Sequence, residues 1–303
     1  MAWRTILMTR PGYLSLKQAS LCIRQEEGEA HVSLEDVAAI VLDNAQLVLT
    51  AQLVSALAAR NIALITVDEV HVPNGVLLSY LPHSRAVKVM RTQLQMGKAQ
   101  KKRLWQNIIQ QKISNQASVL QNISAVSEAS LLEAMSQKVK SGDPDNYEAQ
   151  ASQTYFKALF GKGFVRREDS LVNAALNYGY SIVRSLIARQ LVGYGFLTAL
   201  GLHHCSEQNA FNLADDLMEP YRPHIDWEVM QLVNHDPSQS QVMSTSLKAS
   251  LVQVVHQDIV RLEKGQTLGQ STLLALVEAT VISLSQRLSD QKNCLVLPGE
   301  VIS

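Results

Sequence analysis

Two adjacent histidines followed by a group of carboxylates are the residues of this chain best suited to chemistry. His203 and His204 lie in the run GLHHCSEQNAFNLADDLMEPY. Asp216 and Glu219 are three residues apart, so they would share one face of a helix. One imidazole and two oxygen ligands could hold a hard divalent cation if a further carboxylate arrived from elsewhere in the chain. The same residues could instead form a solvated acidic helix beside a surface loop, and this segment alone leaves both interpretations open.

A further carboxylate, Glu148, follows a sequence that breaks helices. The run Ser141–Pro144 ends the preceding helical pattern, and Asp145 or Asn146 caps a new helix. This places Glu148 in the first turn, where the helix dipole favours a carboxylate. Taken alone, Glu148 is therefore explained by helix stability.

The charges are distributed unevenly along the chain. The whole chain carries 27 basic and 27 acidic residues, but the stretch between His71 and Ser127 contains no Asp or Glu. The basic residues of this stretch are Arg85, Lys88, Arg91, Lys98, Lys101, Lys102, Arg103 and Lys112. A second basic loop contains Lys162, Arg166 and Arg167. Such segments fit a local track that faces a polyanion, and they fit a solvated helical face equally well.

Composition and motifs exclude several classes of protein. With 47% hydrophobic and 18% charged residues among 303, the chain has the composition of an ordinary globular protein. Polar and charged residues interrupt the longest apolar runs, so we expect no membrane span and no membrane partner. Three scattered cysteines provide neither a disulfide framework nor a CxxC metal site, which favours the cytoplasm. The sequence has no Walker-type phosphate loop and no GxGxxG, GxSxG or HExxH motif.

The hydrophobic pattern divides the chain into a strand-rich part and a helical part. Short β-branched runs between turn signals dominate residues 1–80, with one helix that Thr50 caps. Helical periodicity dominates after residue 83 and includes a predicted helix over Gln241–Leu262. The sequence therefore predicts an α+β protein with a small, β-rich, sandwich-like N-terminal domain over residues 1–83 and a larger all-α catalytic domain over residues 84–303.

Two amides in the most hydrophobic predicted helix require partners if they are buried. Asn173 and Asn177 lie four residues apart in the run that begins at Leu171. They could hydrogen-bond to each other in the core, or they could line a cleft.

Three longer runs carry a family resemblance. They are the opening AWRTILMTRPGYLSL, the run GDPDNYEAQASQTYFKALFG around Glu148, and GLHHCSEQNAFNLADDLMEPYRP around the histidine pair. Together they resemble the CRISPR adaptation integrase, the first of the universal Cas subunits, in the form typical of its type II branch. The resemblance spans nearly the whole chain. Ala210 stands where the type II pattern has Pro and Tyr221 where it has Phe, and neither difference removes a polar ligand.

The resemblance implies a catalytic metal site. Glu148 matches the glutamate that begins a helix in this family, His204 matches the single histidine of other branches, and Glu219 matches the second acidic ligand, in DLMEP. In the family these three groups are catalytic and bind Mg²⁺ or Mn²⁺. Asp216 matches an acid that other branches often need, and the resemblance leaves open whether Asp215 or Asp216 touches the metal.

The resemblance also implies a reaction and partners. A DNA 3′-hydroxyl attacks a phosphodiester and inserts a short DNA segment into a CRISPR array, and with water as the nucleophile the same site acts as an endonuclease. The implied partners are double-stranded DNA, a second copy of the chain and a dimer of a small ferredoxin-like Cas subunit. Phosphate contacts are expected from Arg85, Lys88, Lys101, Lys102, Arg103, Lys162, Arg166 and Arg167. Two alternatives are a structure-selective nuclease of DNA repair and a non-catalytic DNA-binding scaffold.

Overall fold

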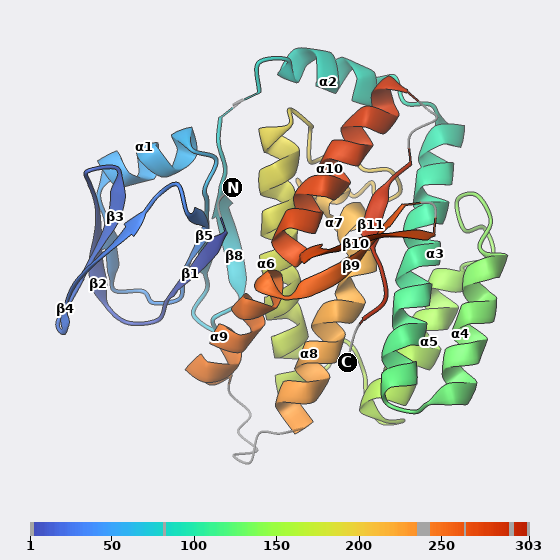
Figure 1. The fold of residues 1–303 in the computed structure, drawn as a ribbon. Coiled ribbons are helices and arrows are strands. Elements are labelled where there is room, and N and C mark those ends of the chain that lie inside the picture. Colours follow the sequence, from blue (N-terminus) through green and yellow to red (C-terminus); the bar gives the residue numbers. More distant parts are fainter. Residues whose placement is uncertain (1–2, 81–82, 235–242, 264, 291–293, 302–303) are drawn as a thin grey trace.

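The computed structural model describes residues 3–80, 83–234, 243–263, 265–290 and 294–301. A β-rich N-terminal part lies beside a larger, mainly helical part (Figure 1). This arrangement confirms the predicted α+β class with its strand-rich N-terminus. Among the described residues, no helix combines the length and the apolar composition that crossing a membrane requires.

Two four-stranded sheets form the N-terminal part. The first sheet has the order β1-β5-β7-β8, with β8 antiparallel and the other neighbours parallel. Its strands are β1 (Arg4–Met8), β5 (Val37–Leu42), β7 (Ala63–Val67) and β8 (Pro73–Leu77). The second sheet, of order β4-β3-β2-β6, consists of β2 (Gly12–Lys17), β3 (Ser20–Gln25), β4 (Gly28–Ser33) and β6 (Leu47–Leu49). Helix α1 (Ala51–Ala59) begins as predicted, because the Thr50 hydroxyl accepts a hydrogen bond from the backbone N–H of Leu53.

The first sheet is buried on both faces. Ile40 and Leu64 belong to the core that this sheet shares with the second sheet and α1. Val41 and Ile65, the next residues along the same strands, belong to the core of the helical part. Successive side chains of a strand point to opposite faces, so the unbroken apolar run of β5, VAAIVL, fits a strand that is covered on both sides.

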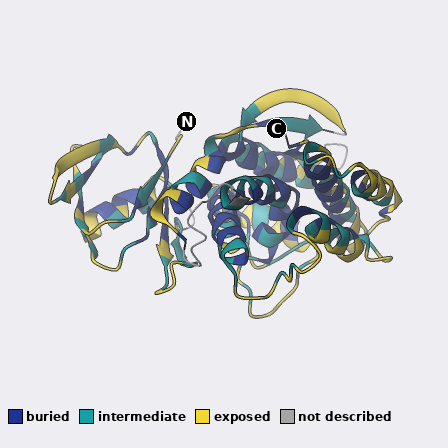
Figure 2. Ribbon diagram, turned by 90° about the horizontal axis from the view of Figure 1, so that it is seen from below, coloured by how far each residue is buried: buried dark blue, intermediate teal, exposed yellow. Residues whose placement is uncertain are grey.

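The helical part is arranged around α6 (Leu171–Gly193), which packs against α7, α8, α9 and α10 (Figure 1). The Ser170 hydroxyl caps α6 by accepting from the backbone N–H of Asn173. Buried residues line the inner sides of the helices (Figure 2). The other helices are α2 (Ala86–Leu94), α3 (Lys98–Asn122), α4 (Val126–Lys138), α5 (Tyr147–Phe160), α7 (Asn212–Met218), α8 (Arg222–Asn234), α9 (Thr245–Gln253) and α10 (Leu273–Ser289). Short 3₁₀ turns follow α7 at Glu219–Tyr221 and α9 at Val254–His256.

The second part is mainly helical but not all-α as predicted. The predicted helix over Gln241–Leu262 is wrong at its C-terminal end, and its first two positions lie outside the described residues. Helix α9 stops at Gln253, and Asp258–Glu263 forms strand β9. This strand pairs antiparallel with β10 (Gln266–Thr272) and β11 (Val296–Pro298). The β-branched pair Ile259 and Val260, followed by Gly265 at φ +74°, favours a strand and a turn over a continued helix.

A buried ion pair connects the two parts of the molecule. Asp43, directly after β5, lies 2.9 Å from Lys248 Nζ on α9, and their side chains are 1% and 6% exposed. The other oxygen of Asp43 lies 2.5 Å from His71 Nδ1. Removing one member of such a pair leaves a buried charge without compensation.

The variant Asp43→Asn is therefore expected to lower the free energy of unfolding by about 3–5 kcal/mol, because it leaves the Lys248 ammonium unpaired. Denaturant titration followed by circular dichroism measures this change. The control is Glu27→Gln, which removes the carboxylate partner of Arg10 from a pair whose side chains are 65% and 76% exposed. An equal shift of the unfolding midpoint in both variants would contradict the assignment.

Candidate active site

Two carboxylates that are 71 positions apart meet at one lysine. Glu148 lies in the first turn of α5, and Glu219 begins the 3₁₀ turn after α7. Lys112 Nζ, on α3, lies 2.8 Å from Glu148 Oε1 and 2.5 Å from Glu219 Oε2. The structure thus brings two of the three predicted ligands to the two sides of one ammonium group.

The first turn of α5 is fixed by Asp143 and not by the predicted cap residues. Asp143 accepts hydrogen bonds from the backbone N–H groups of Tyr147 and Glu148, both at 2.9 Å. Asn146 has a left-handed backbone with φ 54°, and its side chain makes no capping hydrogen bond. The carboxylate of Asp143 therefore fixes where α5 begins, and with it the position of the Glu148 side chain.

Asp216 holds the loop that contains His203 and His204, here called the histidine loop, and it orients His204. Its Oδ1 lies 2.8 Å from Nδ1 of His204 and accepts the backbone N–H of the same residue at 3.0 Å. Its Oδ2 accepts the backbone N–H groups of Leu202 at 2.5 Å and His203 at 3.2 Å. Because Asp216 engages Nδ1, the other ring nitrogen of His204, Nε2, is left for a ligand. The Asp216 carboxylate is fully buried and contacts His204 on the side of the ring opposite Nε2.

The loop reaches this geometry because residue 201 has no side chain. A Cβ atom at Gly201 would lie 2.2 Å from the carbonyl oxygen of His204 and 2.7 Å from Oδ2 of Asp216. The next residue along the loop, His203, stacks flat on Trp105 of α3, with ring centroids 4.2 Å apart and planes within 2°. These contacts make His204, and not His203, the histidine available to a metal.

Asp215 is committed to a different partner. Arg184 of α6 binds it through two contacts, Nε to Oδ1 at 2.6 Å and Nη2 to Oδ2 at 3.0 Å. Asn209 donates a third hydrogen bond to Oδ2 at 2.6 Å. Of the two adjacent aspartates, Asp216 therefore supports the histidine and Asp215 ties the loop to α6.

The electrostatics of the site favour charged carboxylates. Burial alone would raise the pKa of Glu219, but the nearby charges of Arg222 and Lys112 outweigh it and lower this pKa to about 2. Arg222 Nε lies 3.0 Å from Glu219 Oε1. Burial would likewise lower the pKa of Lys112, and the charges of Glu219 and Glu148 raise it instead. Glu219, Lys112 and Arg222 are thus ionised at neutral pH.

His204 belongs to the same electrostatic cluster. Its hydrogen bond with Asp216 raises its pKa most, against the effect of burial, and the charges of Glu219 and Glu148 raise it further. The imidazole therefore lies near enough to the two glutamates to feel their charge, although the ligand atoms of these three residues do not all lie within 4.8 Å of one another. The contact of the buried Glu219 Oε2 is the Lys112 ammonium, at 2.5 Å. Two carboxylates and one imidazole form a donor set that fits Mg²⁺ or Mn²⁺.

Another cluster of possible metal ligands lies on the second sheet. Ligand atoms of Cys22, Glu29 and His31, on β3 and β4, lie within 4.8 Å of one another. Glu29 is already paired with Lys17 at 3.3 Å and Arg24 at 3.6 Å. With one thiol and a single carboxylate, this cluster is a poorer donor set for Mg²⁺ or Mn²⁺ than two carboxylates and an imidazole.

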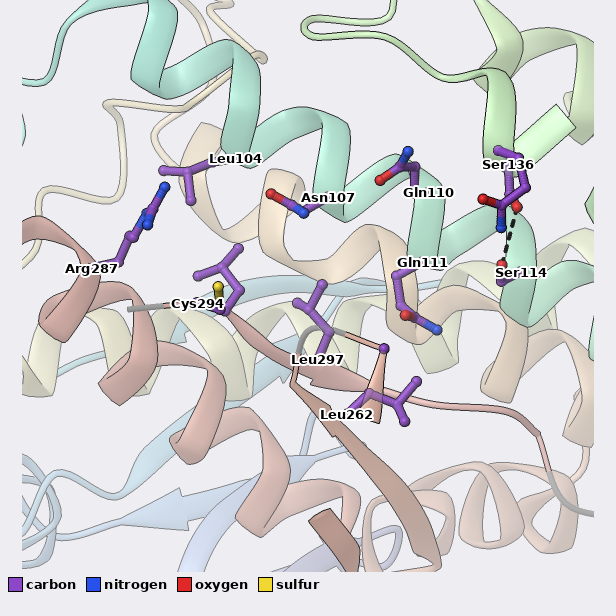
Figure 3. Close-up of a pocket in the computed structure, with 13 residues that line it drawn as sticks. Leu104, Asn107, Gln110, Gln111, Ser114, Ser136, Leu262, Arg287, Cys294 and Leu297 are labelled. Atoms are coloured by element: carbon purple, nitrogen blue, oxygen red, sulfur yellow. Dashed lines mark hydrogen bonds between the residues drawn. The ribbon is translucent and has the colours of Figure 1, made fainter. Parts of the chain in front are cut away.

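A groove along α3 is separate from this site. A cavity of about 510 Å³ lies between α3, α4 and the β9–β11 sheet, and Asn107, Gln110 and Gln111 project into it from α3 (Figure 3). Leu262 and Leu297 contribute apolar surface. No carboxylate occurs among its described lining residues, so it lacks the oxygen ligands that a divalent cation needs.

The predicted DNA-contacting residues fall into two groups. Exposed cations that are free to meet a phosphate are Arg85, Lys88, Lys102, Arg103, Lys162 and Arg167. Lys101 instead donates to the carbonyl oxygen of Gly201 at 3.0 Å, beside the histidine loop. Arg166 donates to Asn173 at 3.1 Å and to Asn177 at 2.8 Å, so the two amides are satisfied by a shared arginine and not by each other.

Lys112 and Arg222 contact the predicted carboxylate ligands, and neither is itself a predicted ligand. Lys112 was counted only as one charge of the basic stretch. Its position among Trp105, Ile108 and Ile109 at helical spacing is the signal that places it on the buried stripe of α3. Arg222 directly follows the EPY segment and offers no comparable signal.

The fold and the site define an α+β protein in which two glutamates meet at a buried lysine, close to a loop histidine that an aspartate orients. The chain belongs to the Cas1 family: the family model "CRISPR associated protein Cas1" matches residues 6–257. It is 43% identical over 260 residues to the CRISPR-associated endonuclease Cas1 of Neisseria meningitidis serogroup C, covering 86% of this chain and 85% of that protein.

Solved structures share the fold. A casposase bound to its integration product matches with a TM-score of 0.75 and 17% identity, covering 95% of this chain and 91% of that one. A chain of the Cas6-RT-Cas1–Cas2 complex matches with a TM-score of 0.71 and 19% identity, covering 95% of this chain and 35% of that one. The family membership confirms the resemblance seen in the sequence.

Proposed function

We propose that this protein is a metal-dependent DNA integrase and endonuclease that inserts new DNA segments into a CRISPR array, in the adaptation stage of prokaryotic adaptive immunity. The observation that carries the proposal is the meeting of Glu148 and Glu219 at Lys112, with His204 oriented by Asp216 within reach of their charge. Membership of the Cas1 family and the 43% identity to a CRISPR-associated endonuclease support it. The fold shared with a casposase bound to an integration product is consistent with strand joining.

The metal is Mg²⁺ or Mn²⁺, held by Glu148, His204 and Glu219. Bound there, the ion would stabilise the charge that develops on the phosphoryl oxygens and on the departing 3′-oxygen. Few protein ligands leave positions open for substrate, and the nitrogen ligand favours Mn²⁺. Asp216 orients His204 through Nδ1, and Arg222 keeps Glu219 ionised. These residues thus hold the ligands in place before DNA arrives.

The proposed partners are DNA and other Cas subunits. The exposed cations of α2 and α3 would bind duplex phosphates without reading sequence. We assign residues 1–83 to dimerisation and partner binding and residues 84–303 to catalysis. A second copy of the chain and a dimer of a small ferredoxin-like Cas subunit complete the assembly, and the shared fold with a chain of the Cas6-RT-Cas1–Cas2 complex supports this composition. Action on an array of chromosomal DNA implies the cytoplasm.

An assay with a labelled hairpin half-site and Mn²⁺ tests the function. Joining of a labelled 3′-end to the target supports the integrase. Cleavage without joining would favour a repair nuclease that uses the same site. Binding with neither reaction would favour a DNA-binding scaffold and would overturn the proposal.

Neutralising two exposed cations of α3 is expected to weaken DNA binding and to flatten its salt dependence. Each lost phosphate contact lowers the slope of log K against log salt by about 0.9, so Lys102→Ala with Arg103→Ala should reduce it by roughly 1.8. Fluorescence anisotropy over a salt series measures the slope. The charge-matched control is Lys17→Ala with Arg24→Ala, whose side chains are 60% and 65% exposed on the N-terminal strands. An unchanged slope would identify the α3 cations as a solvated face.

A further inference from the structure

Lys112 occupies an unusual environment for a lysine. It lies on the stripe of α3 that also buries Ile108, Ile109 and Ile113, and only 6% of the residue is exposed. Burying an ammonium group costs several kcal/mol unless it is closely paired. Its two pairing oxygens belong to Glu148 and Glu219, the two proposed carboxylate ligands.

The charges around Lys112 are balanced without any further ion. The two glutamates contribute two negative charges, and Lys112 and Arg222 contribute two positive charges. A divalent cation would add two positive charges to a group that is already neutral. The withdrawal of one resident cation would lower this excess from +2 to +1.

Geometry selects Lys112 as the cation that withdraws. Its nitrogen lies 2.8 and 2.5 Å from oxygens of both ligands, whereas Arg222 contacts Glu219 alone. Mg²⁺ binds oxygen ligands at about 2.0–2.1 Å. An ion between these oxygens would lie within bonding distance of the lysine nitrogen, and like charges repel strongly at that separation. Arg222 is also held over the ring of Tyr180 at 4.5 Å, which anchors it.

We propose that Lys112 is a displaceable internal cation that keeps Glu148 and Glu219 facing each other and competes with the divalent ion for their oxygens. This inference rests on the proposed function, because it takes these two residues as metal ligands. Lys112 is a positioning residue in this scheme. It sets the metal affinity of the site, and its flexible four-carbon stem allows the ammonium to move aside while α3 stays in place.

The test compares Mn²⁺ binding by three purified full-length proteins, with free Mn²⁺ followed by electron paramagnetic resonance and no DNA present. Lys112→Met retains much of the side-chain volume and removes the charge, so Mn²⁺ is expected to bind about ten-fold more tightly than in the unaltered protein. Lys112→Arg retains the charge and is expected to stay within about three-fold of it. Equal or weaker Mn²⁺ binding by a folded Lys112→Met variant would overturn the proposal, because a merely structural lysine would give that result.

Thermal unfolding provides a second measurement. In EDTA, Lys112→Met is expected to unfold at a lower temperature, because the two carboxylates repel each other without a cation. Saturating Mn²⁺ is expected to stabilise this variant more than the unaltered protein. If Lys112→Met is unfolded in EDTA, recovery of the folded state in Mn²⁺ supports the proposal, and failure to recover overturns it.

The variant Glu148→Ala distinguishes failure of the proposed metal site from failure of the proposed role of Lys112. If it binds Mn²⁺ as tightly as the unaltered protein, the metal site of the proposed function is wrong. If Glu148→Ala loses Mn²⁺ binding while Lys112→Met binds Mn²⁺ no more tightly than the unaltered protein, the metal site is supported and only the role of Lys112 is wrong.

Discussion

Glu219→Gln is expected to lower the rate of strand joining on the order of a thousand-fold, because it removes a charged metal ligand and metal stabilisation of the transition state provides several kcal/mol. Gln is preferable to Ala here. The side chain of Glu219 is 4% exposed and contacts both Lys112 and Arg222, so truncation would also leave two cations facing a void. Single-turnover joining of a labelled hairpin half-site in Mn²⁺ measures the loss.

DNA affinity is the internal control for this result. It should stay within a few-fold in Glu219→Gln, because the exposed cations that contact phosphate are untouched. The matched variant is Glu207→Gln, which changes an exposed carboxylate in the histidine loop. Joining by Glu219→Gln within ten-fold of the unaltered protein would remove Glu219 from the proposed metal site, and so would an equal loss in Glu207→Gln.

Asp216→Asn is expected to weaken Mn²⁺ binding and to slow joining by about 10–100-fold, the usual cost of losing the carboxylate behind a metal-bound histidine. The substitution replaces one carboxylate oxygen by an amide that cannot accept the backbone N–H groups of the histidine loop. The ring of His204 would then lose its fixed orientation. Titration with Mn²⁺ and single-turnover joining report the two effects separately.

The neighbouring aspartate provides the matched comparison. Asp215→Asn has the same chemistry one residue away, but Asp215 binds Arg184 and not His204. We expect Mn²⁺ affinity in Asp215→Asn to remain within about three-fold of the unaltered protein. If the two variants lost affinity equally, the assigned division between Asp216 and Asp215 would be wrong.

Sequence reasoning reached the candidate ligands but not the contacts that make them a site. The motif around Glu148 and the spacing from His204 to Glu219 predict three ligands, and the fold brings two of them, Glu148 and Glu219, to one lysine. The choice between Asp215 and Asp216 depends on how α7 faces the histidine loop. That orientation follows from packing against α6 and from the close fit at Gly201, and neither is local in sequence.

For Lys112 on α3, the sequence indicates that the side chain is buried but does not indicate its partners. The spacing of Trp105, Ile108 and Ile109 places Lys112 on the buried stripe, so its burial could have been predicted. Its partners could not, because they depend on how α3 packs against α5 and the 3₁₀ turn.

The sheet of the second part was missed for a related reason. Strand β9 follows a helical segment directly, and its partner β11 comes more than 30 positions later in the chain. Nothing local distinguishes Asp258–Glu263 from the end of a helix, apart from two β-branched residues. In the first 80 residues, short apolar runs between turn residues indicate β1, β3, β5, β7 and β8, whereas β2, β4 and β6 were not predicted.

The sheet that carries β5 and β7 has a mechanical consequence. Val41 and Ile65 interlock with the helical core, while Ile40 and Leu64, on the opposite face, interlock with α1 and the outer strands. A subunit bound to the N-terminal strands would therefore rotate α6 and the histidine loop together with them. The orientation of the protein on its target would be set by that subunit and not by a hinge between the two parts.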